Sequence, residues 1–175
     1  MAIDTYIDRA LALGADEARL IQTDQIVTAH WVRLKCQFGC GAYGKNLMCP
    51  PYSPSPEQTQ KMLREYRRGM LLTYRVESAE EEYRLRKRMK KAIAGLEREL
   101  FLSGYYNAFG MTSGPCNLCE KCDVTQPCKL PRLARPSMEA CGIDVFSTGQ
   151  NMGIKLNVVT SDQQPFTYCG LILFE

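Results

Sequence analysis

The chain has 175 residues, a length typical of a single domain. Hydrophobic residues make up 45% of it and charged residues 23%, an ordinary globular composition that excludes a disordered, coiled-coil or collagen-like protein. The formal net charge of +3, from 22 Lys and Arg against 19 Asp and Glu, is too small to indicate a dedicated nucleic-acid-binding protein.

The first part of the chain predicts a helix, a strand and a second helix. Apolar residues at helical spacing predict an amphipathic helix over residues 2–13, and a short strand follows over residues 15–22. Residues 24–35 again show helical spacing, with Asp24 as the residue that would cap the helix. His30 lies on the apolar face of this predicted helix, so we expect it to be packed in the core.

The middle of the chain predicts two further helices and two strands. Capping boxes of Ser55 with Gln58 and of Ser78 with Glu81 indicate where the helices begin. The predicted elements are a helix over 55–68, a strand over 70–76, a long helix over 78–102 and a strand over 105–111. A long helix that connects two strands of one sheet is a crossover, so we expect those two strands to be parallel.

The last part of the chain predicts short helices over residues 137–152 and closing strands over 157–160 and 166–174. Together the elements predict one α/β or α+β domain spanning residues 1–175, with a small mixed sheet and a long crossover helix. Its two cysteine-bearing loops cover residues 36–51 and 114–131.

Cysteine is the residue type that departs most from average usage, because the chain has nine cysteines against a single histidine. The number is odd, most of the cysteines lie in two groups, and a reducing compartment would keep them as thiols. We therefore interpret the grouped cysteines as metal ligands or redox groups and expect no disulfide framework.

The strongest motif is Cys-x2-Cys-x2-Cys-x5-Cys, which is formed by Cys116, Cys119, Cys122 and Cys128. Three cysteines at this spacing let one tight loop present thiolates to the corners of an iron–sulfur cube, as in ferredoxins. Structural zinc is usually bound by two Cys-x-x-Cys pairs with a longer spacer between them. The motif therefore favours a 4Fe–4S cluster, and zinc is the alternative.

Cys36, Cys40 and Cys49 form a second group in a glycine-rich segment. Cys36 and Cys40 are four residues apart, so one helical turn would place their sulfurs on the same side. The glycines between the cysteines would let backbone amides approach a negatively charged cluster, and Cys49 precedes a proline, as does the last cysteine of the ferredoxin motif. Buried structural cysteines are the alternative interpretation of this group.

The remaining cysteines, Cys141 and Cys169, lie in helix-like and strand-like sequence. Free cysteine is often buried and behaves as a small hydrophobic residue, so we expect both to be packed in the core. Ligation of a cluster by either residue is the alternative.

Taken together, the ordered motifs resemble a cysteine-rich family of predicted metal-binding proteins of unknown function (domain of unknown function 2284), whose members occur mainly in anaerobic archaea and bacteria. The motifs are Cys36-x3-Cys40-x2-Tyr43-Gly44-x4-Cys49-Pro50-Pro51, then Gly114-Pro115-Cys116-x2-Cys119-x2-Cys122-x5-Cys128, then the segment from Arg135 to Phe146. The resemblance implies metal or cluster binding by the seven cysteines of the first two motifs. It does not extend to Cys141 or Cys169, and it implies no particular reaction.

Seven ligands do not divide into two sets of four. Either Cys141 or Cys169 completes a second cluster, which predicts an electron carrier, or Cys36, Cys40 and Cys49 hold a cluster through three thiolates. The second arrangement would leave one iron open and so predicts an enzyme. We expect one or two 4Fe–4S clusters that act in electron transfer or in a cluster-dependent redox step in an anaerobe; a zinc-binding structural or interaction module is the alternative.

The sequence also bears on partners and location. No apolar run approaches the ~20 residues of a membrane-spanning helix, and the N-terminal residues include acids where a signal peptide carries Lys or Arg. We expect a cytoplasmic protein with a redox partner protein, or a small molecule at an open iron, and neither membrane nor nucleic acid as a partner.

The basic run over residues 84–91 is interpreted as a solvated helix face, with RNA or an acidic redox partner as alternatives. The oligomeric state stays open.

Overall fold

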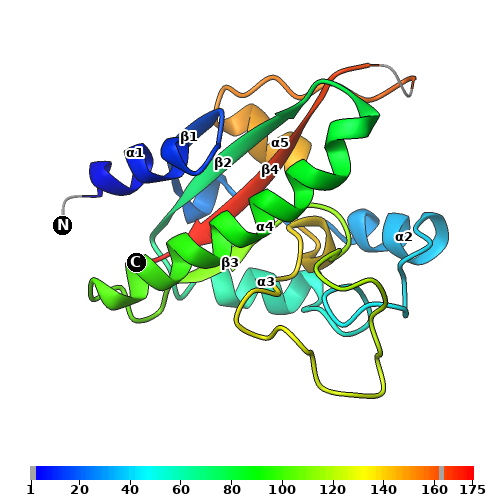
Figure 1. Ribbon diagram of the computed structural model, residues 1–175. Coiled ribbons are helices and arrows are strands. Elements are labelled where there is room, and N and C mark those ends of the chain that lie inside the picture. Colours follow the sequence, from blue (N-terminus) through cyan, green and yellow to red (C-terminus); the bar gives the residue numbers. More distant parts are fainter. Residues whose placement is uncertain (1–2, 162–163) are drawn as a thin grey trace.

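The computed structural model describes residues 3–161 and 164–175 and has helices on both faces of one sheet (Figure 1). In chain order the elements are α1 Asp4–Ala12, β1 Glu17–Gln22, the 3-10 turn η1 Thr23–Gln25, α2 His30–Gly39, α3 Pro56–Leu63, β2 Arg68–Val76, α4 Ala79–Leu102, β3 Phe109–Met111, the 3-10 turn η2 Glu139–Cys141, α5 Val145–Asn151 and β4 Phe166–Leu173. Within the described residues, no helix is both long enough and apolar enough to cross a membrane.

The strand order in the sheet is β1-β2-β4-β3, and each neighbouring pair is antiparallel. The C-terminal strand β4 lies between β2 and β3, with Leu171 opposite both Leu71 and Met111. Since β2 and β3 are each antiparallel to β4, they run parallel to one another, as expected for strands joined by the crossover helix α4. The fold is therefore α+β, and antiparallel ladders replace the mixed sheet that the sequence predicted, because β4 separates the two parallel strands.

Alternate residues of the sheet face two hydrophobic cores. One core lies under α1 and α4 and includes Met70 and Leu72 of β2, whereas Leu71 of the same strand faces the other core with Leu171 of β4. Because β2 is covered on both faces, its sequence is a nearly continuous apolar run without polar alternation. The second core is closed by α3, α5 and η2, on the side of the molecule that carries the cysteine loops (Figure 1).

The two predicted capping boxes have different outcomes. At α3 the box is confirmed, since the Ser55 hydroxyl accepts from the Gln58 amide at 3.3 Å and the Gln58 side chain accepts from the Ser55 amide at 2.8 Å. At α4 the Ser78 side chain makes no cap hydrogen bond. Three glutamates in the first turn of α4 place negative charge beside its positive N-terminal end instead.

The predicted helix over residues 24–35 is wrong at its N-terminal end. Residues 23–25 form the 3-10 turn η1, residues 26–29 are extended, and α2 begins only at His30. Thr28 pairs with Ile143 in an isolated bridge, so this segment runs beside the η2–α5 connection and Ile26 enters the second core from an extended backbone. His30 at the start of α2 faces solvent and lies 3.1 Å from Glu57, which corrects the expectation of a packed histidine.

The predicted strand over residues 157–160 is irregular. β4 already has β2 and β3 as neighbours, so these residues have no free sheet edge beside the strand that follows them. The remaining elements agree with the sequence prediction to within a few residues, including the long helix α4 and the short helices after residue 137. Residue 2, the first of the predicted N-terminal helix, lies outside the described residues.

Candidate metal centre

The two cysteine loops lie against each other on the side of the molecule that carries α2 and α3 (Figure 1). Asn46 connects them, because its buried side-chain amide donates to the Cys116 carbonyl at 2.9 Å and its side-chain oxygen accepts from the Met48 amide at 3.1 Å. The Leu47 amide is directed at the Cys122 sulfur at 3.5 Å. Residues about 70 positions apart in the chain therefore form one local structure.

The loop that carries Cys116 to Cys128 is anchored at its end to the long helix. Arg135 makes a half-buried ion pair with Glu97 of α4, its Nε lying 2.6 Å from one carboxylate oxygen. The same oxygen accepts from the Gly110 amide of β3 at 2.7 Å. Between these anchors the loop has no regular secondary structure, so the positions of its cysteines depend on the groups they contact.

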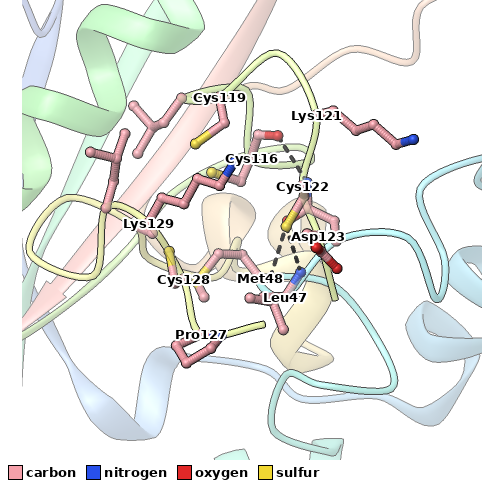
Figure 2. Close-up of a pocket in the computed structure, with 14 residues that line it drawn as sticks. Leu47, Met48, Cys116, Cys119, Lys121, Cys122, Asp123, Pro127, Cys128 and Lys129 are labelled. Carbon is pink, nitrogen blue, oxygen red and sulfur yellow. Dashed lines mark hydrogen bonds between the residues drawn. The ribbon is translucent and has the colours of Figure 1, made fainter. Parts of the chain in front are cut away.

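All four cysteines of this loop line one small cavity of about 30 Å³ together with residues 46–48 (Figure 2). Cys116, Cys119, Cys122 and Cys128 are each half-buried. Lys129 is an exposed residue that also lines this cavity, and its side chain lies near the sulfurs (Figure 2). The cavity therefore offers four thiols, one amide hydrogen bond to sulfur and a cationic side chain in a confined space.

Cys36, Cys40 and Cys49 are brought together on the other side of Asn46. Cys36 lies in the last turns of α2 and Cys40 follows its end, with the Cys40 amide donating to the Cys36 carbonyl at 3.3 Å. This is the one-turn separation that the spacing predicted. Cys49 is buried, and its amide donates to the Asn46 carbonyl at 2.9 Å.

The charges of these three thiols influence one another. Burial, together with the nearby Cys40 and Cys36 thiolates, raises the pKa of the Cys49 thiol to about 11. Burial likewise raises the pKa of Cys36, with Cys40 contributing in the same direction. In the metal-free protein Cys36 and Cys49 are therefore held as thiols, and a bound cation would favour the thiolates.

A turn in the loop that carries Cys40 and Cys49 depends on a glycine. Gly44 adopts a left-handed conformation with φ of +68°, and its amide donates to the Pro50 carbonyl at 2.8 Å. Residues other than glycine rarely adopt this backbone conformation, so Gly44 fixes the path of the chain from Cys40 to Cys49. Arg33 of α2 then ties the end of the loop to η2 by donating to the carbonyls of Pro54 at 3.2 Å and Ala140 at 2.7 Å.

Cys141 and Cys169 are packed in the second core, as the sequence predicted. Burial raises the pKa of each thiol to about 12. Cys169 also lines one side of a cavity that Cys36 and Cys40 line. Neither residue borders the cavity of the Cys116 loop.

Sequence analysis missed a buried lysine between the two groups of cysteines. Lys90 of α4 is 0% exposed, and its ammonium donates to the Ser113 carbonyl at 2.8 Å. Burial lowers the pKa of Lys90 to about 8, against the opposing effect of Cys116, Glu139 and Cys49. A buried ammonium is stable only beside negative or strongly polar groups, so Lys90 adds a positive charge to the cysteine region.

The rest of the basic run agrees with its interpretation as a solvated helix face. Arg84, Arg88 and Lys91 are exposed, while Leu85 and Met89 enter the core under α4. Lys90 and Arg86 are the exceptions, since the Arg86 side chain is only 18% exposed. The position of Lys90 beside the apolar stripe is the signal in the sequence that distinguishes it from Lys91.

The donor set has the chemistry of a thiolate metal centre. Among residues 3–161 and 164–175, no three His, Cys, Asp or Glu side chains converge closely enough to hold one metal ion. Six of the seven cysteines of the two loops nevertheless line two cavities, four of them one cavity and Cys36 and Cys40 the other, and an amide is directed at the sulfur of Cys122. Soft sulfur donors of this kind select zinc or iron–sulfur clusters.

The fold and the site thus define an α+β domain with two adjoining cysteine-rich loops. The model of a family described as predicted metal-binding protein (DUF2284) matches residues 19–174, and the chain belongs to this family. The match confirms the family resemblance that the ordered cysteine motifs indicated. No curated protein and no solved structure matches the chain.

Proposed function

We propose that this protein binds a 4Fe–4S cluster through Cys116, Cys119, Cys122 and Cys128 and acts in electron transfer. The observation that carries the proposal is the single cavity that all four cysteines line, with the Leu47 amide directed at the Cys122 sulfur. Hydrogen bonds from backbone amides to ligand sulfurs are among the interactions that set the potential of iron–sulfur clusters. The cluster would supply one-electron chemistry, and the chain would supply its ligands and their charge environment.

The spacing of the cysteines in the sequence favours a cluster over a single zinc ion. Three cysteines separated by two residues each, with a fourth a little further on, are typical of iron–sulfur ligation, whereas structural zinc usually takes two Cys-x-x-Cys pairs with a longer spacer. The cavity of about 30 Å³ has room for about one water molecule, so the loop would open to admit a cluster.

A second cluster at Cys36, Cys40 and Cys49 would have three thiolate ligands in this loop. The structure places Cys169 on a cavity that Cys36 and Cys40 also line, but the backbone around Cys169 is the central strand β4. A rigid strand restricts the movement by which Cys169 could become a fourth ligand. Three thiolates leave a coordination position for a small molecule, so we propose this group as the reactive one.

Elemental analysis of protein purified without oxygen tests the proposal directly. We expect a brown protein with broad visible absorption, four or eight iron atoms per chain and an equal amount of acid-labile sulfide. The control is the same protein after exposure to a chelator and oxidant, which should be colourless. Colourless anaerobic protein with stoichiometric zinc would contradict the proposal and establish a zinc-binding module instead.

The reactive role of the second group has its own test. Cyanide added to the reduced protein should shift one set of paramagnetic resonance signals, because cyanide binds iron that lacks a fourth protein ligand. The Cys40→Ala protein should lose this shift but keep the signals of the other cluster. If cyanide changes no signal in the unmodified protein, both clusters are fully ligated and the protein is an electron carrier alone.

A further inference from the structure

A cavity of about 400 Å³ lies beside the second cysteine group, and neither electron transfer nor metal binding explains it. Cys36 and Cys40 line one part of it, α5 and the irregular segment after α5 line another, and β4 closes a third side. Cavities of this size are typical of small-molecule sites.

The rim of this cavity is strongly apolar and exposed. Trp31, Phe146, Val158 and Val159 all line it, and their exposed fractions are 48%, 47%, 68% and 45%. Large apolar side chains that gather at one opening usually indicate a binding site, whereas single ones scattered over a surface do not. The apolar part of a ligand would cover these four residues.

One carboxylate with a buried oxygen borders the cavity. Glu139 of η2 lines it, and one of its carboxylate oxygens accepts from the Ser113 hydroxyl at 3.0 Å. The other oxygen is buried and has no hydrogen-bond partner within the described residues. A buried acceptor without a partner costs free energy, and an N–H donor brought by a ligand would remove that cost once the carboxylate turns toward the cavity.

The charges around the cavity favour a cationic ligand over an anionic one. Glu139 and Asp144 line it, and Lys35 is the only cationic side chain among the described residues that do. Asp144 is already engaged, since its carboxylate caps α5 by accepting from the Ser147 amide at 3.1 Å. Glu139 opposes the lowering of the Lys90 pKa, but Lys90 does not line the cavity and its ammonium is directed at the Ser113 carbonyl.

We propose that this cavity binds a small, mainly apolar molecule that carries a protonated amine, with Glu139 as the group that recognises the amine. The apolar part would lie against Trp31 and Phe146, and the ligand would then reach the side of the cavity lined by Cys36 and Cys40. The inference holds for whichever metal the cysteines bind.

Two small molecules of similar shape and opposite charge serve as probes of the proposed amine site. Each is added to the metal-loaded protein. Phenethylamine and 3-phenylpropionate share a phenyl ring and a two-carbon linker, and calorimetric titration reports the binding of each. Trp31 is the only tryptophan of the chain, so its emission is an independent reporter at the rim. We expect saturable binding of the amine and binding of the acid that is at least about tenfold weaker, because the amine gains a charge-assisted hydrogen bond to Glu139 and the acid is repelled by it.

Variants assign the effect to individual residues. Glu139→Gln should weaken amine binding about tenfold and remove the preference for the amine, since the charge is lost while the shape is kept. Glu65→Gln removes an exposed carboxylate outside the cavity and should change nothing. Phe146→Ala, at a half-exposed position where folding is not at risk, should weaken amine binding about threefold or more but retain the preference.

The proposal is overturned if neither probe saturates, if both bind equally, or if Glu139→Gln keeps the preference for the amine. If Glu139→Gln does not fold, the proposal is tested instead by comparing the binding of the two probes to the unmodified protein and to Phe146→Ala. The metal content of the same samples is measured in parallel. Amine binding by a zinc-loaded protein would contradict the iron–sulfur proposal alone, whereas a brown protein that binds neither probe would contradict the cavity proposal alone.

Discussion

The Cys119→Ala protein should lose roughly half of its bound iron or more, because the cluster of the Cys116 loop would keep only three of its four thiolates. Residues 114–131 should then become sensitive to protease. The segment has no helix or strand of its own, so its order depends on the ligands and on the few contacts with residues 46–48. Iron analysis and limited trypsin digestion followed by mass spectrometry measure the two effects.

The trypsin sites are well placed for this test. Lys121, Lys129 and Arg132 are exposed within or directly after the loop, so cleavage there reports the opening of the loop itself. Cys169→Ala is the matched control, since it removes a thiol that is packed in the second core. It should keep the iron content and the protease resistance of the unmodified protein. A loss of about half the iron from Cys169→Ala would instead identify Cys169 as the missing fourth ligand of the other cluster.

Replacing Lys90 with Met should have opposite effects on the metal-free and the metal-loaded protein. In the metal-free protein burial favours the uncharged thiols of Cys49 and Cys116, the cysteines that influence Lys90, so removing the buried ammonium should raise the free energy of unfolding by about 1 kcal/mol or more. In the loaded protein the same charge lies near Cys49 and Cys116, whose thiolates are negative when they bind metal. The variant should therefore retain less metal.

The reduction potential gives a further measure of this charge. Reduction adds a negative charge to a cluster, and a nearby cation stabilises the reduced form more than the oxidised form. The potential of Lys90→Met should consequently be more negative than that of the unmodified protein. Potentiometric titration and denaturant unfolding of the metal-free form provide the two measurements.

Lys91→Met is the control for Lys90→Met, because Lys91 is the next residue of α4 and is exposed. It should leave metal content, potential and stability nearly unchanged, since exposed charges are screened by solvent. If Lys90→Met destabilises the metal-free and the loaded protein equally and does not move the potential, Lys90 has a packing role only.

Local sequence patterns predicted those elements whose causes are local. The capping box at Ser55 and Gln58 fixed the start of α3, and the apolar stripe of α4 predicted a helix of nearly its observed length. The predicted start at Asp24 failed because residues 26–29 pair and pack with distant parts of the chain, as Thr28 does with Ile143. Such a partner overrides the helical spacing of the apolar residues, and no local pattern indicates it.

The candidate site also has features that local sequence predicted and features that only tertiary packing produced. The spacing of Cys116, Cys119 and Cys122 indicated one shared loop, and the structure places all three on one cavity with Cys128. The sequence did not indicate that Asn46 would join the two loops, nor that Lys90 would be buried between them. Both features come from the packing of segments that lie far apart in the chain.

The sequence by itself determined the types of metal-binding side chain, their grouping into two loops and the helices that flank them. These follow from residue chemistry and from periodicity over a few turns of chain. The tertiary structure alone decided that β4 separates β2 from β3, that the two loops touch, and that a cavity with Glu139 opens beside Cys36. The physical reason is that each of these features depends on which distant surfaces bury one another, and burial is a property of the whole folded chain.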